Sequence, residues 1–267
     1  MTADLSKLRI ALMQCISQPD DVAGNLTRLA AAAASIAELG ARLLITPEMM
    51  VSGYNIGADG AHRLADPVDG PIAQRLAAIA REHRLAILYG CPEIDDSGVV
   101  YNAIRLVDAT GETVATHHKT HLYGDLDRSM VAAGDIAPPV VDLDGWRLGL
   151  ATCYEVEFPE VVRSLAVRDA DVICVPTANM VEFDAVQRIL LPARAVESQV
   201  FVAYANYCGV EGELTYGGLS EVVAPTGEIL AIADRAPEIL VVDLDRALLE
   251  VSRLGNPYLA DRRPDLY

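Results

Sequence analysis

Short apolar runs of strand length alternate with longer segments of helical periodicity along the first ninety or so residues. Apolar positions three or four residues apart predict helices over residues 22–39 and 71–83. Gly40 ends the first helix, and Pro71 begins the second. The runs around them predict strands over residues 8–13, 42–46 and 85–89. This order of strand, helix and strand is typical of a parallel α/β sheet.

The pattern then changes to include hairpins. Strands over 101–107 and 113–118 flank a turn at 108–111, and strands over 140–143 and 146–150 flank Asp144-Gly145. Further on, the pattern predicts helices over 159–168 and 186–197, strands over 172–175 and 200–205, and a hairpin turn at Thr226-Gly227. A total of about a dozen strands is too many for one comfortable open sheet. Two helix-covered sheets packed on each other would accommodate them.

Composition supports an ordered protein with small-molecule partners. The 267 residues are 52% hydrophobic but only 5% aromatic, which predicts a core of aliphatic side chains in one domain over residues 1–267. With 38 acidic and 21 basic residues, the net charge is -17. Such a charge repels phosphate backbones and anionic lipid headgroups, so we expect neither nucleic acid nor membrane as a partner.

The cysteines and the first residues indicate a reducing compartment. The five cysteines are an odd number without C-x-x-C spacing, which argues against a disulfide framework or a zinc site. Residues 1–15 show no secretory signal pattern, and no apolar run is long enough to span a membrane. We therefore expect a cytoplasmic protein.

Several common enzyme signatures are absent from the sequence. It contains no G-x-S-x-G, G-x-x-x-x-G-K-[ST], G-x-G-x-x-G or H-E-x-x-H, so serine hydrolase, P-loop and Rossmann interpretations lose their usual support. His117, His118 and His121 suggest a metal site at first sight. On an extended segment, however, adjacent side chains point to opposite faces, and structural histidines are the commoner case.

Cys153 is the cysteine best placed for chemistry. It ends an apolar strand and precedes a turn that leads into the helix expected from residue 159. A thiol at such an elbow would lie at the rim of the sheet, near backbone N–H groups that can hold an oxyanion. The alternative is an inert core cysteine, which is how we interpret Cys15, Cys91, Cys174 and Cys208.

Two charged residues at strand ends would complement a nucleophilic thiol. Glu48 follows the strand over 42–46, where partial burial would raise its pKa and make it a general base and then a general acid. Lys119 would lower the pKa of the thiol and neutralise charge on a tetrahedral intermediate. Strand-end charges also occur in ordinary surface ion pairs, so each residue alone leaves both interpretations open.

Together, these three places resemble the nitrilase superfamily of carbon-nitrogen hydrolases, and most of all its amidase branch. The matching segments are Leu-Ile-Thr-Pro-Glu at 44–48, His-Lys-Thr-His-Leu at 118–122 and Cys-Tyr-Glu-Val-Glu-Phe-Pro-Glu at 153–160, in the family's order. Further similar segments continue to the tail at 261–267, so the likeness spans essentially the whole chain.

The resemblance implies a fold, an assembly and residue roles. The fold would be an αββα sandwich, with two mixed β-sheets flanked by helices in four layers. Two chains would form a homodimer, with the C-terminal tail from about residue 250 to 267 at the subunit interface. Cys153 would be the nucleophile, Glu48 the general base and acid, and Lys119 with the backbone N–H of Tyr154 would stabilise the oxyanion. No metal or organic cofactor is implied.

One position departs from the family. Members commonly carry a second active-site glutamate a short loop beyond the lysine, and eight residues after Lys119 this chain has Asp127. Asp125 is the other carboxylate in this loop, so which of the two orients a substrate, if either, stays open. A milder departure is Glu155, where aspartate is frequent. Candidate residues of the pocket wall are Tyr54, Tyr123, Asn179 and Met180, and Arg128 is a candidate partner for a substrate carboxylate.

The expected reaction is cysteine-dependent hydrolysis of a small-molecule amide. An acyl-thioester on Cys153 would be hydrolysed by water, giving a carboxylic acid and ammonia. A nitrilase or an N-carbamoyl amino acid hydrolase is the alternative, because the same thiol can attack a nitrile or ureido carbon. A protein of a different class, a non-catalytic binding or scaffold member of the fold or a redox-sensing thiol protein, is the remaining alternative.

Overall fold

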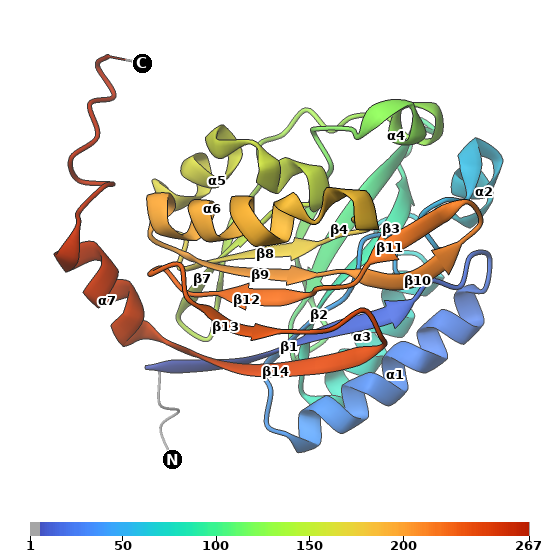
Figure 1. Cartoon of the computed structure of the whole chain (residues 1–267). Coiled ribbons are helices and arrows are strands. Elements are labelled where there is room, and N and C mark those ends of the chain that lie inside the picture. Colours follow the sequence, from blue (N-terminus) through green and yellow to red (C-terminus); the bar gives the residue numbers. More distant parts are fainter. Residues whose placement is uncertain (1–5, 267) are drawn as a thin grey trace.

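Two β-sheets pack face to face in the computed structural model, which describes residues 6–266 (Figure 1). The first sheet contains, in spatial order, β11 (Leu214–Gly217), β10 (Tyr207–Glu211), β1 (Lys7–Ile16), β2 (Leu43–Ile45), β3 (Ala86–Ile94), β4 (Val100–Val107) and β5 (Thr113–His118). A further strand, β14 (Glu238–Asp245), runs antiparallel to most of β1. The pairing is parallel from β1 to β3 and antiparallel from β3 to β5, so the sheet is mixed.

The second sheet is mixed in the same way. Its order is β13 (Ile229–Ile232), β12 (Glu221–Val223), β9 (Phe201–Ala205), β8 (Val172–Pro176), β7 (Trp146–Leu150) and β6 (Val140–Leu143). The three central strands β7, β8 and β9 are parallel, whereas the outer pairs are antiparallel. The hairpin expected at Thr226-Gly227 is confirmed by the pairing of β12 with β13.

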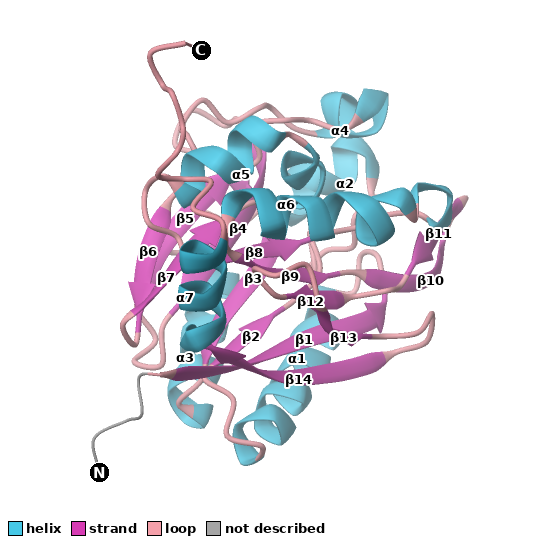
Figure 2. Ribbon diagram, turned by 60° about the vertical axis from the view of Figure 1, so that its left-hand side comes forward, coloured by secondary structure: helices cyan, strands magenta, loops and turns pink. Residues whose placement is uncertain are grey.

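Helices cover the outer face of each sheet, which completes four layers (Figure 2). Leu29 of α1 (Val22–Glu38) and Leu76 of α3 (Pro71–His83) pack in one apolar cluster with the first sheet. Leu165 of α5 (Pro159–Ala166) and Leu191 of α6 (Leu191–Ser198) pack in another with the second sheet. The expected αββα sandwich is therefore confirmed, because each amphipathic element buries its apolar side against a sheet.

Aliphatic side chains fill the space between the two sheets, as the composition predicted. Leu12 and Ile45 of the first sheet meet Leu148 and Val172 of the second within one buried cluster. Trp146, the only tryptophan of the chain, is 1% exposed in this layer. Burial of apolar surface on both faces of each sheet explains the long apolar runs in the central parallel strands.

Some elements differ from those expected. The segment beyond Lys119, expected to be a short loop, forms the short helix α4 (Gly124–Met130), which packs near α2 (Gly57–Leu64). The helix expected over 186–197 is divided into a π-helical turn, Val186–Leu190, and α6. The strands β10, β11 and β14 and the helix α7 (Arg246–Gly255) were not predicted. β10 and β14 both pair with β1, which lies far away in the sequence, whereas β10 and β11 form a local hairpin that the sequence reasoning missed.

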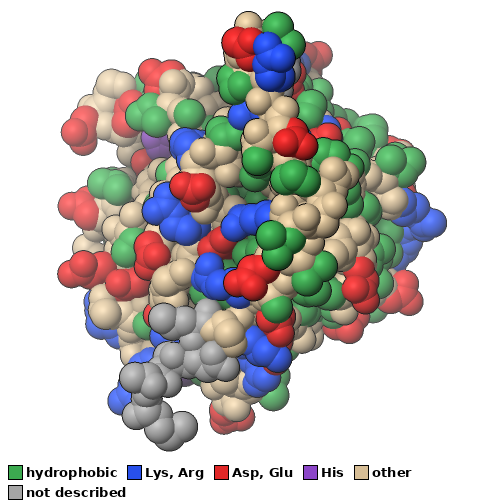
Figure 3. All heavy atoms as spheres, turned by 90° about the vertical axis from the view of Figure 1, so that its left-hand side faces the viewer, with side chains coloured by type: hydrophobic (Ala, Val, Ile, Leu, Met, Phe, Trp, Pro, Cys, Tyr) green, Lys and Arg blue, Asp and Glu red, His purple; other side chains and the backbone are tan. Residues whose placement is uncertain are grey.

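The C-terminal segment lies at one side of the molecule. After α7, residues 256–266 run away from the two sheets (Figures 1 and 2). The face that carries α7 mixes acidic, basic and hydrophobic side chains (Figure 3). Within residues 6–266, no helix has the length and apolar character needed to cross a bilayer. Residues 1–5 and 267, which belong to the domain expected over 1–267, lie outside the described residues.

Candidate active site

The ends of β2, β5 and β7 bring Glu48, Lys119 and Cys153 into one buried site. Glu48 follows β2 by three residues, Lys119 directly follows β5, and Cys153 follows β7 by three residues. Lys119 Nζ lies 2.7 Å from Glu48 Oε1. Both charges act on the Cys153 thiol, Glu48 raising its pKa and Lys119 lowering it, after the larger effect of burial. Three residues far apart in the sequence thus meet in one buried cluster.

One ammonium group lies between two carboxylates. Lys119 Nζ is 2.7 Å from Asp127 Oδ2 as well as 2.7 Å from Glu48, and all three side chains are fully buried. Asp127 also accepts hydrogen bonds from the Tyr54 hydroxyl at 2.8 Å and from the Tyr123 backbone N–H at 2.8 Å. Burial alone would lower the Lys119 pKa, but the surrounding negative charges raise it, so the amine stays charged.

One carboxylate oxygen of Glu48 accepts hydrogen bonds, and the other has no hydrogen-bond partner among the described residues. Oε1 accepts hydrogen bonds from Lys119 Nζ and from Asn102 Nδ2, each at 2.7 Å. Oε2 is buried and has no hydrogen-bond partner among the described residues. Burial raises the Glu48 pKa, Lys119 opposes the rise, and Asp127 adds to it. Glu48 therefore has both an unoccupied oxygen and an increased proton affinity, which are the properties of a general base near neutral pH.

Cys153 begins a 3-10 turn, Cys153–Glu157, that precedes α5. It therefore follows a short connection after β7 rather than ending the strand itself. Its φ of 48° lies in the left-handed region, which is uncommon for a residue with a side chain. Burial raises the pKa of its thiol strongly, Glu48 adds to this, and Lys119 with hydrogen bonds from Thr177 and Ala178 opposes it. The resting sulfur is thus a protonated thiol that needs a base.

The Glu155 carboxylate connects the cysteine turn to the lysine segment. It accepts hydrogen bonds from the Thr120 backbone N–H at 2.8 Å and from the Thr152 backbone N–H at 2.7 Å. The His117 side chain lies 2.9 Å from the same carboxylate. These donors flank Lys119 on one segment and Cys153 on the other. Glu155 therefore fixes the two catalytic candidates relative to each other, a role that the sequence did not reveal.

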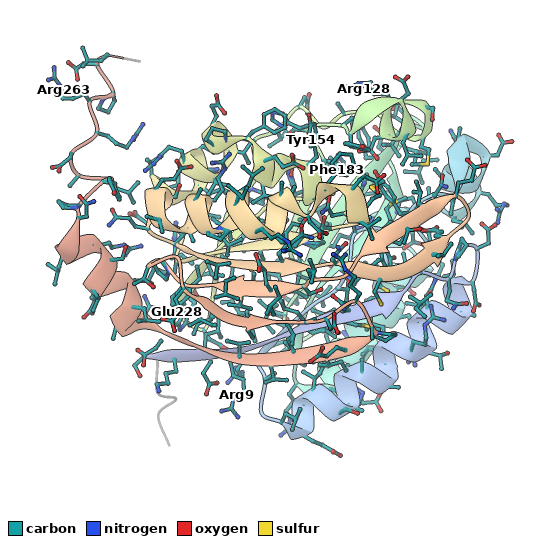
Figure 4. All side chains as sticks on the ribbon, in the orientation of Figure 1. Arg9, Arg128, Tyr154, Phe183, Glu228 and Arg263 are labelled. Atoms are coloured by element: carbon teal, nitrogen blue, oxygen red, sulfur yellow. The ribbon has the colours of Figure 1, made fainter. Side chains whose placement is uncertain are left out.

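A cavity of about 260 Å³ opens beside the thiol. Figure 4 shows Tyr154 and Phe183 close together at this end of the molecule, with Arg128 farther out on α4. The cavity is lined by Tyr54, Tyr123, Cys153, Tyr154, Glu157, Ala178, Asn179, Met180 and Phe183. Its volume is near the lower end of the range for ligand pockets, so it suits a small molecule.

The structure separates the candidates of the sequence into those that line the cavity and those that do not. Tyr54, Tyr123, Tyr154, Asn179 and Met180 line it. Asp127 does not line the cavity but pairs with Lys119, whereas Asp125 is exposed. Arg128 is also exposed and belongs to a different surface hollow, so it does not face the thiol.

Sequence reasoning missed several residues that the fold brings to the site. Asn102 comes from the middle of β4, and Thr177 follows β8. Glu157, at the end of the turn Cys153–Glu157, and Phe183, at the end of the turn Val181–Phe183, also line the cavity. Gln187, in the π-helical turn, accepts a hydrogen bond from Asn179 Nδ2 at 3.1 Å. Interrupted helices of this kind often mark functional sites, but their sequence signal is weak.

The histidines have separate partners instead of a shared centre. His117 bonds to Glu155, His118 lies 2.9 Å from Glu93 Oε1, and His121 packs against Phe158. In the part of the chain that the structure describes, no group of three or more His, Cys, Asp or Glu side chains has the geometry to hold a metal ion. These contacts favour the structural interpretation of the histidines.

The other four cysteines are buried and unpaired, as expected. Burial raises the pKa of Cys15, Cys91 and Cys174 to about 12. Burial also raises the pKa of Cys208. Neither Glu48 nor Lys119 is among the groups that shift the pKa of these four thiols, so Cys153 differs from them by its neighbours and not by its burial.

Comparison with known proteins places the chain in a family. The carbon-nitrogen hydrolase family model matches residues 9–253. A protein of Pseudomonas protegens described as a hydrolase in the pqqF 5' region is 50% identical over 97% of this chain and 90% of its own length. An (R)-stereoselective amidase of a Pseudomonas species is 35% identical over 96% of this chain and 92% of its own.

A solved structure agrees with the sequence comparison. The amidase from Nesterenkonia sp. AN1, as a double mutant in complex with acrylamide, superposes with a TM-score of 0.86 at 38% identity, covering 98% of this chain and 96% of that one. Another structure of that amidase carries the acetamide moiety of fluoroacetamide covalently on its active-site cysteine. This protein belongs to the carbon-nitrogen hydrolase family and is an amidase-type enzyme that acts on carbon-nitrogen bonds other than peptide bonds.

Proposed function

We propose that the protein hydrolyses small-molecule amides to carboxylic acids and ammonia, with Cys153 as nucleophile, Glu48 as general base and acid, and Lys119 as the positive stabiliser. The observation that carries this proposal is the unbonded Oε2 of Glu48, buried beside a protonated thiol and next to a fixed ammonium. The covalent adduct on the cysteine of the Nesterenkonia amidase supports the same role for Cys153.

Acylation begins when Glu48 takes the proton of the Cys153 thiol as sulfur attacks the amide carbon. The new carbon-sulfur bond pushes the carbonyl electrons onto oxygen, where the Lys119 ammonium and the Tyr154 backbone N–H stabilise the negative charge. Glu48 then protonates the amide nitrogen, the carbon-nitrogen bond breaks, and ammonia leaves. The product of this half-reaction is an acyl-thioester on Cys153.

Deacylation uses the same groups in reverse order. Glu48 removes a proton from water as its oxygen attacks the thioester carbon, and the oxyanion forms again at the same place. Collapse breaks the carbon-sulfur bond, the sulfur regains a proton from Glu48, and the carboxylic acid leaves. Asp127 holds Lys119 from the other side through the 2.7 Å contact. It thereby keeps the ammonium in place through both half-reactions, without contact with the reacting atoms.

Nitriles and N-carbamoyl compounds are the alternative substrates, because their carbon atoms accept the same attack. Amides are favoured because the (R)-stereoselective amidase and the Nesterenkonia amidase, which resemble this chain over nearly all its length, are both amidases. Ammonia release from a panel of amides, nitriles and N-carbamoyl amino acids distinguishes these classes. We expect turnover of small amides first.

Replacement of the nucleophile provides the decisive test. Cys153→Ala should remove amide hydrolysis, and Cys208→Ala, which removes another buried thiol, should leave it unchanged. Mass spectrometry after treatment with a small haloacetamide should find the adduct on Cys153 and not on the other cysteines. Undiminished hydrolysis by the Cys153→Ala protein would overturn the proposal.

We also propose a homodimer and a reducing, cytoplasmic location. All five cysteines are unpaired, which suits such a compartment.

Leu254 and Leu266, in α7 and the tail after it, are 85% and 68% exposed, which supports a subunit contact there. Light scattering should give twice the mass of the chain, and a chain ending at residue 255 should dissociate more readily. A monomer at micromolar concentration would contradict this assembly.

A further inference from the structure

An unpaired carboxylate lines the cavity beside the nucleophile. Glu157 is the last residue of the turn that begins at Cys153, and its side chain is half-buried in the cavity wall. Its backbone oxygen accepts a hydrogen bond from Arg194 Nη2 at 2.6 Å. The carboxylate itself has no hydrogen bond or ion pair within residues 6–266. A partly buried charge without a partner is costly, which makes this carboxylate a natural place for a ligand group.

No basic side chain lines the same cavity. Its nine lining residues include Glu157 but no Lys, Arg or His. Lys119 lies behind the thiol with its charge shared between Glu48 and Asp127. The nearby Arg194 donates to the Val156 carbonyl at 3.1 Å and pairs with Glu197 at 2.9 Å. Burial raises the Glu157 pKa, and Lys119 and Arg194 oppose this rise without pairing with the carboxylate, so the charge that faces a ligand inside the cavity is that of Glu157.

A second carboxylate adds to the negative charge near the cavity. Glu182, in the exposed turn Val181–Phe183, acts together with Glu157 to raise the pKa of the Tyr123 hydroxyl, after the larger effect of burial. The nearby Asp184 is already neutralised by Arg188 and Arg235. Among the described residues, Glu182 has no ion pair of its own. An approaching cation would be attracted and an approaching anion repelled.

Aromatic rings form the rest of the wall. The Tyr123 ring packs edge to face with Tyr154, with centroids 5.6 Å apart, and with Phe183, with centroids 5.8 Å apart. Such rings bury a short aliphatic chain well, and their faces favour a cation over an anion. A positive group that reaches Glu157 would thus meet both a carboxylate and aromatic surface.

We infer that the preferred substrates of this enzyme are short amides whose acyl chain carries a primary ammonium group, and that Glu157 is the residue that selects them by pairing with that group. The inference rests on the proposed amide hydrolysis, since it places the ammonium in the cavity that also holds the scissile carbonyl. Amides with a terminal carboxylate are selected against by the same residue.

Three amides of nearly equal size test this selection. 4-Aminobutanamide ends in an ammonium group, pentanamide in a methyl group and glutaramate in a carboxylate, each after three methylenes. For the native enzyme we expect kcat/KM to fall in that order. Glu157→Gln keeps the shape of the side chain but removes its charge. It should lower kcat/KM for 4-aminobutanamide about tenfold or more, mainly through KM, because a charge-assisted contact is lost.

The control reactions separate this inference from the proposed function. Glu157→Gln should change kcat/KM for pentanamide by less than about twofold and raise it for glutaramate. Glu160→Gln, an exposed change three residues later, should leave all three values unchanged. Equal losses on all three amides, or no preference of the native enzyme for the ammonium compound, would overturn the role of Glu157. If none of the amides, including pentanamide, were hydrolysed, the proposed function itself would fail.

Discussion

The carboxylate of Glu155, two residues after Cys153, lies 2.9 Å from His117 Nε2, two residues before Lys119. This buried contact joins segments of the two different sheets, because His117 belongs to β5 and Glu155 to the turn after β7. The Glu155 carboxylate therefore ties the segment that carries the ammonium to the turn that carries the thiol. Geometry at this scale matters, since displacements of about 1 Å can reduce rates about a hundredfold.

Glu155→Gln should lower kcat while leaving KM for amides nearly unchanged. The amide NH2 of glutamine would face one of the two backbone donors, at Thr120 or at Thr152, because each donates to a different carboxylate oxygen, and an unsatisfied buried donor costs about 1–3 kcal/mol. We expect the free energy of unfolding to fall by about that amount and kcat to fall about tenfold or more. Steady-state kinetics and urea unfolding measure both, with Glu160→Gln as the exposed control. A variant as active as the native enzyme would show that the contact is dispensable.

The same residue makes stability depend on pH in the acid range. Burial alone would raise the Glu155 pKa, but hydrogen bonds from His117 and Thr120 lower it below its ordinary value. The stability that this carboxylate contributes is therefore present above its unfolded pKa of about 4.5 and is lost as the pH falls through the lower folded value. The difference in unfolding free energy between the native protein and Glu155→Gln should shrink as the pH is lowered from 6 towards about 3. A difference independent of pH would exclude this electrostatic origin.

Asp127→Asn should move the acid limb of the pH-rate profile to lower pH. The negative charge of Asp127 raises the Glu48 pKa, and it also shares the Lys119 ammonium with Glu48. Removing that charge lowers the Glu48 pKa, so the base stays ionised at lower pH. A weaker base also takes the thiol proton less well, and kcat on the plateau should fall.

The pH profile of kcat/KM between about pH 4 and pH 9 checks this expectation. Asp125→Asn provides the matched control, since Asp125 is exposed on the same helix two residues earlier and should leave the profile in place. A shift of the acid limb to higher pH in Asp127→Asn would mean that the two carboxylates do not compete for one ammonium.

Gly90→Ala should displace Glu48, the proposed general base, through its backbone. A Cβ at position 90 would lie 2.2 Å from the Met49 backbone nitrogen and 3.0 Å from Glu48 Cα, which only a backbone shift can relieve. We expect a loss of about 1–3 kcal/mol in unfolding free energy together with a fall in kcat. Gly149→Ala provides the comparison, because its nearest atom, Ile173 Cδ1 at 2.8 Å, belongs to a side chain that can move. Equal activities of the two variants would contradict the displacement of Glu48.

The fold followed from sequence for most neighbouring segments that pair or pack, although the local hairpin of β10 and β11 was missed. The hairpins around Asp144 and Thr226, and the helices α1 and α3, are local and carry clear periodicity and turn residues. β14 was missed because it pairs along β1, more than two hundred residues earlier in the chain. The number of layers could still be inferred, because about a dozen strands are too many for one comfortable open sheet.

For the site, the sequence identified the residues with distinctive chemistry and missed their supports. Cys153, Glu48 and Lys119 stood out through their position at strand ends and through the family resemblance. Asn102 and Thr177 are ordinary polar residues in β4 and after β8, and nothing local distinguishes them from structural ones. Only the strand order of the first sheet, in which β4 lies two strands from β2, makes the Asn102 amide a donor to Glu48.

Glu221 is a buried carboxylate outside the catalytic site, and its replacement should stabilise the protein at neutral pH. It lies on β12 opposite Tyr204 of β9, and both its oxygens lack a hydrogen-bond partner in the described part of the chain. Burial raises its pKa from 4.5 to about 8. Between these values the folded protein binds more protons than the unfolded chain, so stability falls as the pH rises from about 4.5 to about 8.

Glu221→Met, which replaces the carboxylate with an apolar chain of similar length, should remove that loss. We expect it to exceed the native protein in unfolding free energy by about 2 kcal/mol at pH 8, with the advantage decreasing towards pH 4.5. Glu228→Met, an exposed change on the same hairpin, should show no such dependence. Urea unfolding at four pH values across the window measures the difference. A raised pKa in the folded state requires the unfolding free energies of the native protein and Glu221→Met to diverge as the pH rises. Parallel plots of unfolding free energy against pH would therefore mean that Glu221 has the same pKa in the folded and unfolded states.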